Sequence, residues 1–162
     1  TDSGKTSNFI ETEIVTTTKD FIFSYKLLTA NIPLFYEMPE NQLLYGKKRV
    51  KIIKDAENTQ PAFNTHFDSL ESKYGIVSIV NLVKPKSESQ EVLAEIYRKC
   101  ADVKSLKITN VISNSSSLVK NPHKLIYLLT EDIYEFGSFT YDREKGIYFG
   151  KQTGVLRISS FD

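Results

Sequence analysis

Apolar and polar residues alternate near the start of the chain in a way that predicts β-strands. The stretch 8–18 (NFIETEIVTTT) sets apolar side chains among threonines, which is typical of a strand. A second strand-like stretch, 21–34, is rich in aromatic and β-branched residues and is bounded by Pro33. A third, 47–54 (KKRVKIIK), is basic at both ends. The first 55 residues are therefore expected to be mainly β-structure.

Further along the chain, apolar residues return with the 3.6-residue period of amphipathic helices. This pattern predicts helices over 61–74 and 88–101 and a third that ends at Phe136, capped by Ser117 or Asn121. Gly75 and Gly137 are well placed to end the first and third helices. The side chains expected on the buried faces are Phe63, Phe67, Leu70 and Tyr74, then Val92, Leu93, Ile96 and Cys100, and then Leu125, Leu128, Leu129 and Ile133.

Strand-like segments separate these helices. Residues 76–83 (IVSIVNLV) form a β-branched run typical of a strand covered on both faces, and 106–112 predicts another. A turn is expected at 142–146 (DREKG), and 150–158 leads into a closing strand. Alternation of strands and helices favours an α/β fold with a mixed, partly parallel sheet flanked by helices. The β-rich start adds antiparallel strands, all within one domain spanning 1–162.

Composition narrows the class of protein. With 162 residues, of which 40% are hydrophobic, the chain is long enough for one domain with a core. Lysine and arginine number 21 against 20 acidic residues, which gives no indication of nucleic-acid binding. No apolar run or secretory signal indicates a transmembrane segment or export, and one cysteine fits a reducing, cytoplasmic location. The chain lacks an initiator methionine and stops after GVLRISSFD, so we expect a segment truncated at both ends.

Most isolated motifs favour structural roles. Ser3–Thr6 (SGKT) resembles the end of a nucleotide-binding P-loop, but a strand pattern follows where the loop requires a helix. His66 and His123 belong to no metal-ligand spacing, so no metal and no cofactor are expected. His66 is expected to be partly buried with a local hydrogen bond, and Cys100 to be a small core residue.

Two charge patterns leave a functional alternative open. Glu11 and Glu13 share one strand face, where paired carboxylates could act in acid–base chemistry or bind a cation. Lys48 and Arg49 lie in the basic run, which is more often an edge strand whose lysines prevent edge pairing. The alternative is a patch that attracts anionic phosphate or a membrane surface.

Five stretches, in order and over nearly the whole chain, resemble the Sac family of phosphoinositide phosphatases found in synaptojanin-like proteins. That family carries ANFVETEQ, IPLFW, FxxHFD, YG…VNL and GVxR elements. The similar stretches here are Asn8–Glu13 (NFIETE), Ile32–Tyr36 (IPLFY), Phe63–Asp68 (FNTHFD), Tyr74–Val83 (YGIVSIVNLV) and Gln152–Arg157 (QTGVLR).

The resemblance implies where catalysis would occur. In the family, the GVxR strand runs into T-N-C-x-D-C-L-D-R-T, whose second cysteine is the nucleophile and needs no metal. Aligned on Arg157, Asp162 would stand directly before that cysteine and flank the catalytic loop. Arg157 either contributes to substrate binding or anchors the strand end through backbone carbonyls. Lys48 and Arg49 are candidates for attraction of a lipid headgroup.

Departures from the family pattern indicate a domain with impaired catalysis. Ile158–Ser160 replaces T-N-C, Thr29–Asn31 replaces Arg-Gly-Ser, Tyr36 replaces Trp, and the FDFHxxCKGM element is not recognisable in 106–115. The resemblance therefore implies part of a phosphoinositide phosphatase that acts peripherally on membrane inositol lipids, with protein partners in trafficking. A working enzyme, a non-catalytic pseudophosphatase module that binds phosphoinositide or protein, and an α/β domain with only structural likeness remain alternatives.

Overall fold

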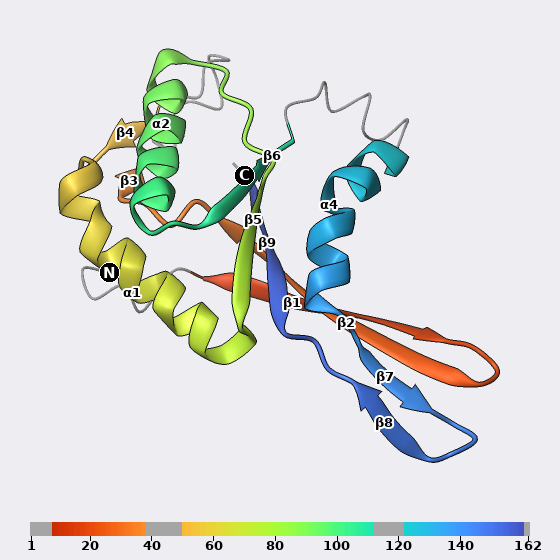
Figure 1. Cartoon of the computed structure of the whole chain (residues 1–162). Helices are drawn as coiled ribbons and strands as arrows, with labels where there is room; N and C mark the ends of the chain where they lie inside the picture. The colour runs from red at the N-terminus through yellow and green to blue at the C-terminus, as the bar shows by residue number, and fades with distance from the viewer. Residues whose placement is uncertain (1–7, 38–49, 112–121, 161–162) are drawn as a thin grey trace.

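The computed structural model describes residues 8–37, 50–111 and 122–160, which form a mixed sheet with helices on both faces (Figure 1). The main sheet has seven strands in the order β6-β5-β9-β2-β7-β8, with β1 also paired to β2. The pairs β5–β6, β5–β9 and β2–β9 are parallel, and the others are antiparallel. The expected fold class, including antiparallel strands near the amino terminus, is confirmed. The strands are β1 (Phe9–Thr17), β2 (Phe21–Asn31), β5 (Ile76–Asn81), β6 (Lys107–Asn110), β7 (Phe139–Asp142), β8 (Ile147–Gly150) and β9 (Gly154–Ser160).

A second, two-stranded sheet pairs β3 (Tyr36–Glu37) with β4 (Lys51–Ile52). The basic strand expected over 47–54 is thus much shorter, and 47–49 lie outside the described residues. Only Ile53 and Lys54 separate β4 from Asp55, the residue that caps the start of the first helix.

Helix α1 (Ala56–Tyr74) begins five residues earlier than the expected start at Pro61. The carboxylate of Asp55 accepts a hydrogen bond from the backbone N–H of Asn58 at 2.9 Å, which satisfies an otherwise unpaired donor of the first turn. Pro61 is therefore inside the helix, where it lacks the N–H of a regular helical hydrogen bond and its ring crowds the preceding turn. The expected buried side chains Phe63 and Phe67 are confirmed in the core.

The two sides of the sheet carry separate apolar clusters. Helices α1 and α2 (Glu88–Val103) cover one side, where Phe67, Leu93 and Cys100 pack against Leu28, Ile79 and Val155 of the sheet. On the other side, α4 (Pro122–Phe136) packs Leu129 and Phe136 against Val80 and Leu156. The central strands are thus covered on both faces, as the β-branched run of β5 predicts.

The face that α4 buries differs from the expected one. Leu129 is buried, but Leu128 and Ile133 are 49% and 38% exposed. The buried position between Leu129 and Phe136 is taken by Asp132, whose Oδ2 accepts a hydrogen bond from Ser78 Oγ at 2.8 Å and which also pairs with Lys107. A hydrophobic pattern does not reveal this orientation, because a buried carboxylate with two partners sets it.

Strand β2 changes partners along one edge. Its first part, from Phe21 to Ser24, pairs with β7, and its last part, from Leu27 to Asn31, pairs with β9. Between them, the side-chain amide of Gln152 accepts from Lys26 N and donates to Lys26 O, both at 2.7 Å. A side chain thus satisfies the backbone where the antiparallel and parallel parts of the sheet meet. The β7–β8 hairpin around the expected 142–146 turn was not foreseen as two paired strands.

Gly75 and Gly146 allow a matched test of how tightly the chain is packed where β5 and β9 begin. Both residues have a positive φ, 83° and 67° respectively. A Cβ on Gly75 would lie 2.0 Å from the carbonyl oxygen of Thr153, whereas on Gly146 it would meet only ordinary contacts. We expect Gly75→Ala to lower the free energy of unfolding by at least about 3 kcal/mol and Gly146→Ala by about 1 kcal/mol. Urea denaturation measures both, and equal losses would contradict the packing described.

Candidate functional site

Polar side chains gather where the parallel strands end. In the register of the sheet, Ser160 of β9 lies beside Asn31 of β2, and Ser159 lies beside Asn81 of β5. Asn81 in turn pairs with Asn110 of β6, and Asn81 Nδ2 donates to Asn110 Oδ1 at 2.9 Å. The carboxyl edge of parallel strands is where α/β proteins usually bind ligands. Three of the segments that depart from the Sac pattern, around Asn31, Asn110 and Ser159, therefore lie together at this edge.

Arg157, expected either to bind substrate or to anchor the strand end, is fully buried beneath this edge. Its Nη2 donates to the carbonyl oxygen of Asn31 at 2.8 Å, and its Nη1 donates to Ser159 Oγ at 2.5 Å. A longer contact of 3.4 Å reaches the hydroxyl of Tyr97, which is itself 2.8 Å from Ser159 Oγ. The guanidinium thus joins the ends of β2 and β9 to helix α2.

The environment of Arg157 is costly for a cation. Among the described residues, no carboxylate lies within ion-pair distance of it, and its Nε has no hydrogen-bond partner. Burial lowers the pKa of Arg157 because the charged form loses its hydration. The ring of Phe67, 5.4 Å from the guanidinium carbon, supplies a cation–π contact. In this structure the side chain of Arg157 bonds only to groups of the described fold, and its role in substrate binding stays a prediction.

His66 of α1 lies in the same buried region. Burial, with a further contribution from the positive charge of Arg157, lowers the pKa of His66 to about 4, so the imidazole is neutral near pH 7. Its Nε2 is buried without a hydrogen-bond partner. The expected burial is confirmed, but the expected local hydrogen bond is absent at this nitrogen. The imidazole ring packs nearly perpendicular to the ring of Phe67, with centroids 5.1 Å apart.

A small pocket of about 340 Å³ opens beside the strand ends, between β5, β6 and α2. Asn81 and Asn110 line it from the sheet, and Tyr97 and Arg98 from the helix. Arg98 is held by Glu95 and Asp102 on its own helix, at 2.7 and 3.1 Å. The pocket therefore offers the amides of Asn81 and Asn110 to a small ligand, and its guanidinium is already paired.

Of the other residues singled out in the sequence, several fall outside the described part of the chain and one lies in the core. Asp162, Lys48 and Arg49 lie outside the described residues, as does the Ser3–Thr6 stretch. Cys100 is confirmed as a core residue: its Sγ faces the carbonyl oxygen of Ala56 at 3.8 Å, and burial raises the pKa of its thiol. Within the described residues, no three His, Cys, Asp or Glu side chains are grouped so that they could hold a metal ion.

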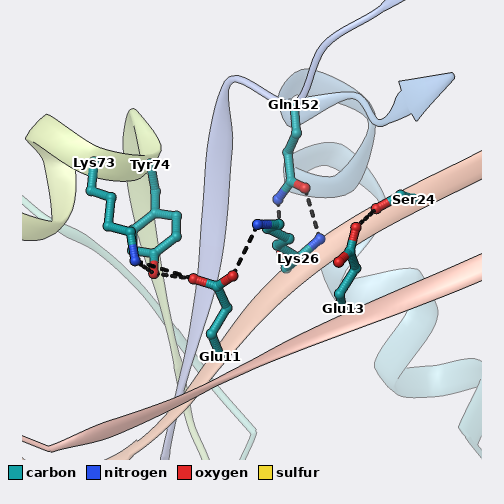
Figure 2. A network of polar contacts seen from close by, with 7 residues as sticks. All are labelled: Glu11, Glu13, Ser24, Lys26, Lys73, Tyr74 and Gln152. Carbon is teal, nitrogen blue, oxygen red and sulfur yellow. Dashed lines mark hydrogen bonds and ion pairs between the residues drawn. The ribbon is translucent and has the colours of Figure 1, made fainter.

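A second polar cluster lies at the opposite end of the central strands (Figure 2). Glu11 accepts hydrogen bonds from the hydroxyl of Tyr74, from Lys26 Nζ at 2.9 Å and from Lys73 Nζ at 3.3 Å. These bonds, led by that from Tyr74, lower the pKa of Glu11 to about 2, so it cannot donate a proton near neutral pH. Glu13, its expected partner in acid–base chemistry, instead accepts from Ser24 Oγ.

The lysines and Tyr74 of this cluster were not expected as site residues. The pairing of Glu13 with Lys26 across β1 and β2 follows from hairpin register once a turn at 18–20 is assumed. Lys73 and Tyr74 are more than 60 positions from Glu11 in the sequence, and no local pattern connects them.

A partly parallel sheet with helices on both faces and polar strand ends defines an α/β domain of the kind that places its ligand site at the carboxyl edge. The chain belongs to the SacI homology domain family, whose model matches residues 1–128. It is 62% identical over 161 residues to the phosphatidylinositol 4,5-bisphosphate 5-phosphatase INP51 of Saccharomyces cerevisiae and 36% identical over 168 residues to human synaptojanin-1.

Inositol-1,4,5-trisphosphate 5-phosphatase 1 of Schizosaccharomyces pombe is 30% identical to the chain over 166 residues. These alignments cover 99% of the chain but only 17% of the INP51 protein, 10% of synaptojanin-1 and 15% of the Schizosaccharomyces protein. The chain thus corresponds to a small part of each relative. No described helix combines the length and hydrophobicity that a membrane span requires.

The buried imidazole predicts a pH-dependent stability. Because the pKa of His66 is about 4 in the folded chain and about 6.5 when unfolded, the unfolded state binds more protons between these values. The stability contribution is complete above about pH 6.5 and is lost as the pH falls toward 4. We expect His66→Phe to reduce the loss of unfolding free energy between pH 7.5 and 4.5 by about 2 kcal/mol.

Urea denaturation at the two pH values measures this difference. Phe63→Leu, on the same helix face, serves as the control because it should lower stability equally at both pH values. The same pH dependence in His66→Phe as in the unsubstituted protein would contradict the assignment of a neutral, buried imidazole.

Proposed function

We propose that the chain is part of a phosphoinositide phosphatase acting on membrane inositol lipids and that this domain is itself catalytically impaired. The family and the names of its relatives, which are phosphoinositide and inositol phosphate phosphatases, support the first part. In this proposal the protein works in the cytoplasm, at the periphery of membranes and with protein partners in trafficking.

The observation that carries the proposed impairment is the use of Arg157. A phosphatase site needs cationic groups that face the phosphate where charge develops. Here the guanidinium is buried and donates to Asn31, Ser159 and Tyr97, which are groups of the fold itself.

The described strand ends hold no cysteine, and the nucleophile that the family resemblance implies would follow Asp162. The side chains gathered there are amides and hydroxyls, and the one cysteine of the chain is Cys100. A nucleophilic thiol requires access and a lowered pKa, whereas Cys100 is buried and its pKa is raised. A catalytic role of Asp162, next to the loop that the family resemblance implies, remains part of the working-enzyme alternative.

The second candidate is a non-catalytic module that binds phosphoinositide or protein. It is favoured by the 340 Å³ pocket at the strand ends, whose largely apolar lining with the amides of Asn81 and Asn110 could hold a ligand without turning it over. Lys48 and Arg49 remain candidates for headgroup attraction in this proposal.

Phosphate release from vesicles that contain single phosphoinositides tests the proposal. The protein is compared with the double variant Asn81→Ala/Asn110→Ala, which removes the amides at the strand ends. We expect the rate for every lipid to change less than about threefold, because an impaired edge contributes nothing to turnover. Retention on the same vesicles, measured by sedimentation, reports the binding alternative.

A fall of about 100-fold or more in the release from any one lipid would show that the strand edge catalyses, since that is the typical effect of removing a transition-state contact. The exposed variant Lys99→Gln on α2, outside the pocket, provides the control for general effects of surface substitution near the edge.

A further inference from the structure

One face of the sheet is only partly covered by helices. Along β2, Leu28, Lys26, Ser24 and Ile22 point to the same face, because side chains alternate along a strand. Leu28 lies in the core beneath α1 and α2, whereas the other three line an open groove of about 920 Å³. The helical layer therefore ends near the last turn of α1, and the sheet continues beyond it toward the two hairpins (Figure 1).

The floor of this groove is made of the apolar and aromatic side chains that usually form a protein core. Val15, Ile22, Phe139, Tyr141 and Tyr148 form it, from four different strands. Tyr148 is 71% exposed, yet it is already ordered against the rings of Tyr141 and Phe139, with centroids 4.8 and 5.9 Å away. Apolar sheet faces are stable when a second layer covers them, and aromatic side chains concentrate where proteins bind each other.

The rim of the groove is positively charged. Lys26, Lys73 and Lys151 line it, against one carboxylate, Glu13. Glu11 stands beside the groove and pairs with Lys26 and Lys73, so the whole cluster keeps one net positive charge. The hydroxyl of Ser24 donates to Glu13, which ties that carboxylate to the sheet. No described residue forms an ion pair with Lys151.

We propose that this groove is a docking site for an amphipathic helix whose apolar stripe is flanked by acidic residues. A helix placed there continues the layer of α1 and α2 over the same sheet face and covers the aromatic floor. Its acidic flanks meet the lysines of the rim, and such helix-in-groove binding is a recurring mode of recognition. The carboxylates complement Lys151 and the partly exposed ammonium groups of Lys26 and Lys73.

This site is separate from the strand-end pocket. The groove includes Gly154 at the start of β9, whereas the polar edge includes Ser159 near its end. At about 3.3 Å per residue, the two ends of the strand are roughly 16 Å apart, so both sites can be occupied at once. The inference therefore does not depend on whether the strand edge turns over phosphoinositides.

Binding of two synthetic helical peptides tests the docking site. One is an amphipathic peptide of about 18 residues with a leucine stripe flanked by glutamates, and the other has lysines in place of the glutamates. We expect the acidic peptide to bind the protein at least about tenfold more tightly, as measured by fluorescence anisotropy at physiological salt. Tyr148→Ser and Lys151→Glu should each weaken its binding about tenfold.

Matched control variants lie on α4, outside the groove. Tyr134→Ser and Lys124→Glu remove an aromatic and a cationic side chain that are similarly exposed, and both should leave peptide affinity unchanged. Equal affinity for the two peptides, or equal effects of groove and control variants, would overturn the proposal.

Evidence for either of two other occupants of the groove would also overturn the proposal of a helical partner. A concentration-dependent dimer that Tyr148→Ser abolishes would assign the groove to a second copy of the chain. Sedimentation with phosphatidylcholine–phosphatidylserine vesicles that Tyr148→Ser abolishes, while Tyr134→Ser does not, would assign it to a bilayer.

Discussion

The burial of one guanidinium constrains the whole carboxyl edge of the sheet. Arg157 lies in the middle of the central strand, and its donors reach the last residue of β2, the end of its own strand and helix α2. A buried cation is tolerated only when hydrogen bonds replace its hydration, so these three groups must keep their positions. Removing any of them would leave the buried charge with fewer compensating hydrogen bonds.

This constraint explains why the polar groups at the end of β9 are already occupied by bonds within the protein. Ser159 and Tyr97 bond to each other as well as to Arg157, which leaves their hydroxyls little capacity for a ligand. His66 completes the region as a neutral ring, because burial, and then the positive charge of Arg157, disfavour its protonated form. The hydroxyl groups that stabilise this edge are therefore not available to bind a ligand. The family resemblance alone does not reveal this.

Local patterns predict the parts of the fold in which neighbours in sequence do the packing. The spacing of Phe63, Phe67 and Leu70 is sufficient for α1, and the run of β5 is sufficient for a central strand. The orientation of α4 depends on Asp132 meeting Lys107, 25 positions away, and no periodicity carries that information. Arg157 also bonds to Tyr97 and Asn31, each 60 or more positions away. Glu11 likewise bonds to Lys73 and Tyr74, more than 60 positions away, so these roles become visible only when the strands are assembled.

The contact between Gln152 and Lys26, where the parallel and antiparallel parts of the sheet meet, makes the fold sensitive to deamidation. One primary amide, that of Gln152, holds both backbone groups of Lys26 and also donates to the carbonyl oxygen of Gly154 at 2.8 Å. Hydrolysis of this amide to a carboxylate would keep the acceptor, remove both donated bonds and place a negative charge against two carbonyl oxygens. Spontaneous deamidation at a single position would thus open the sheet between its parallel and antiparallel parts, without any change to the apolar core.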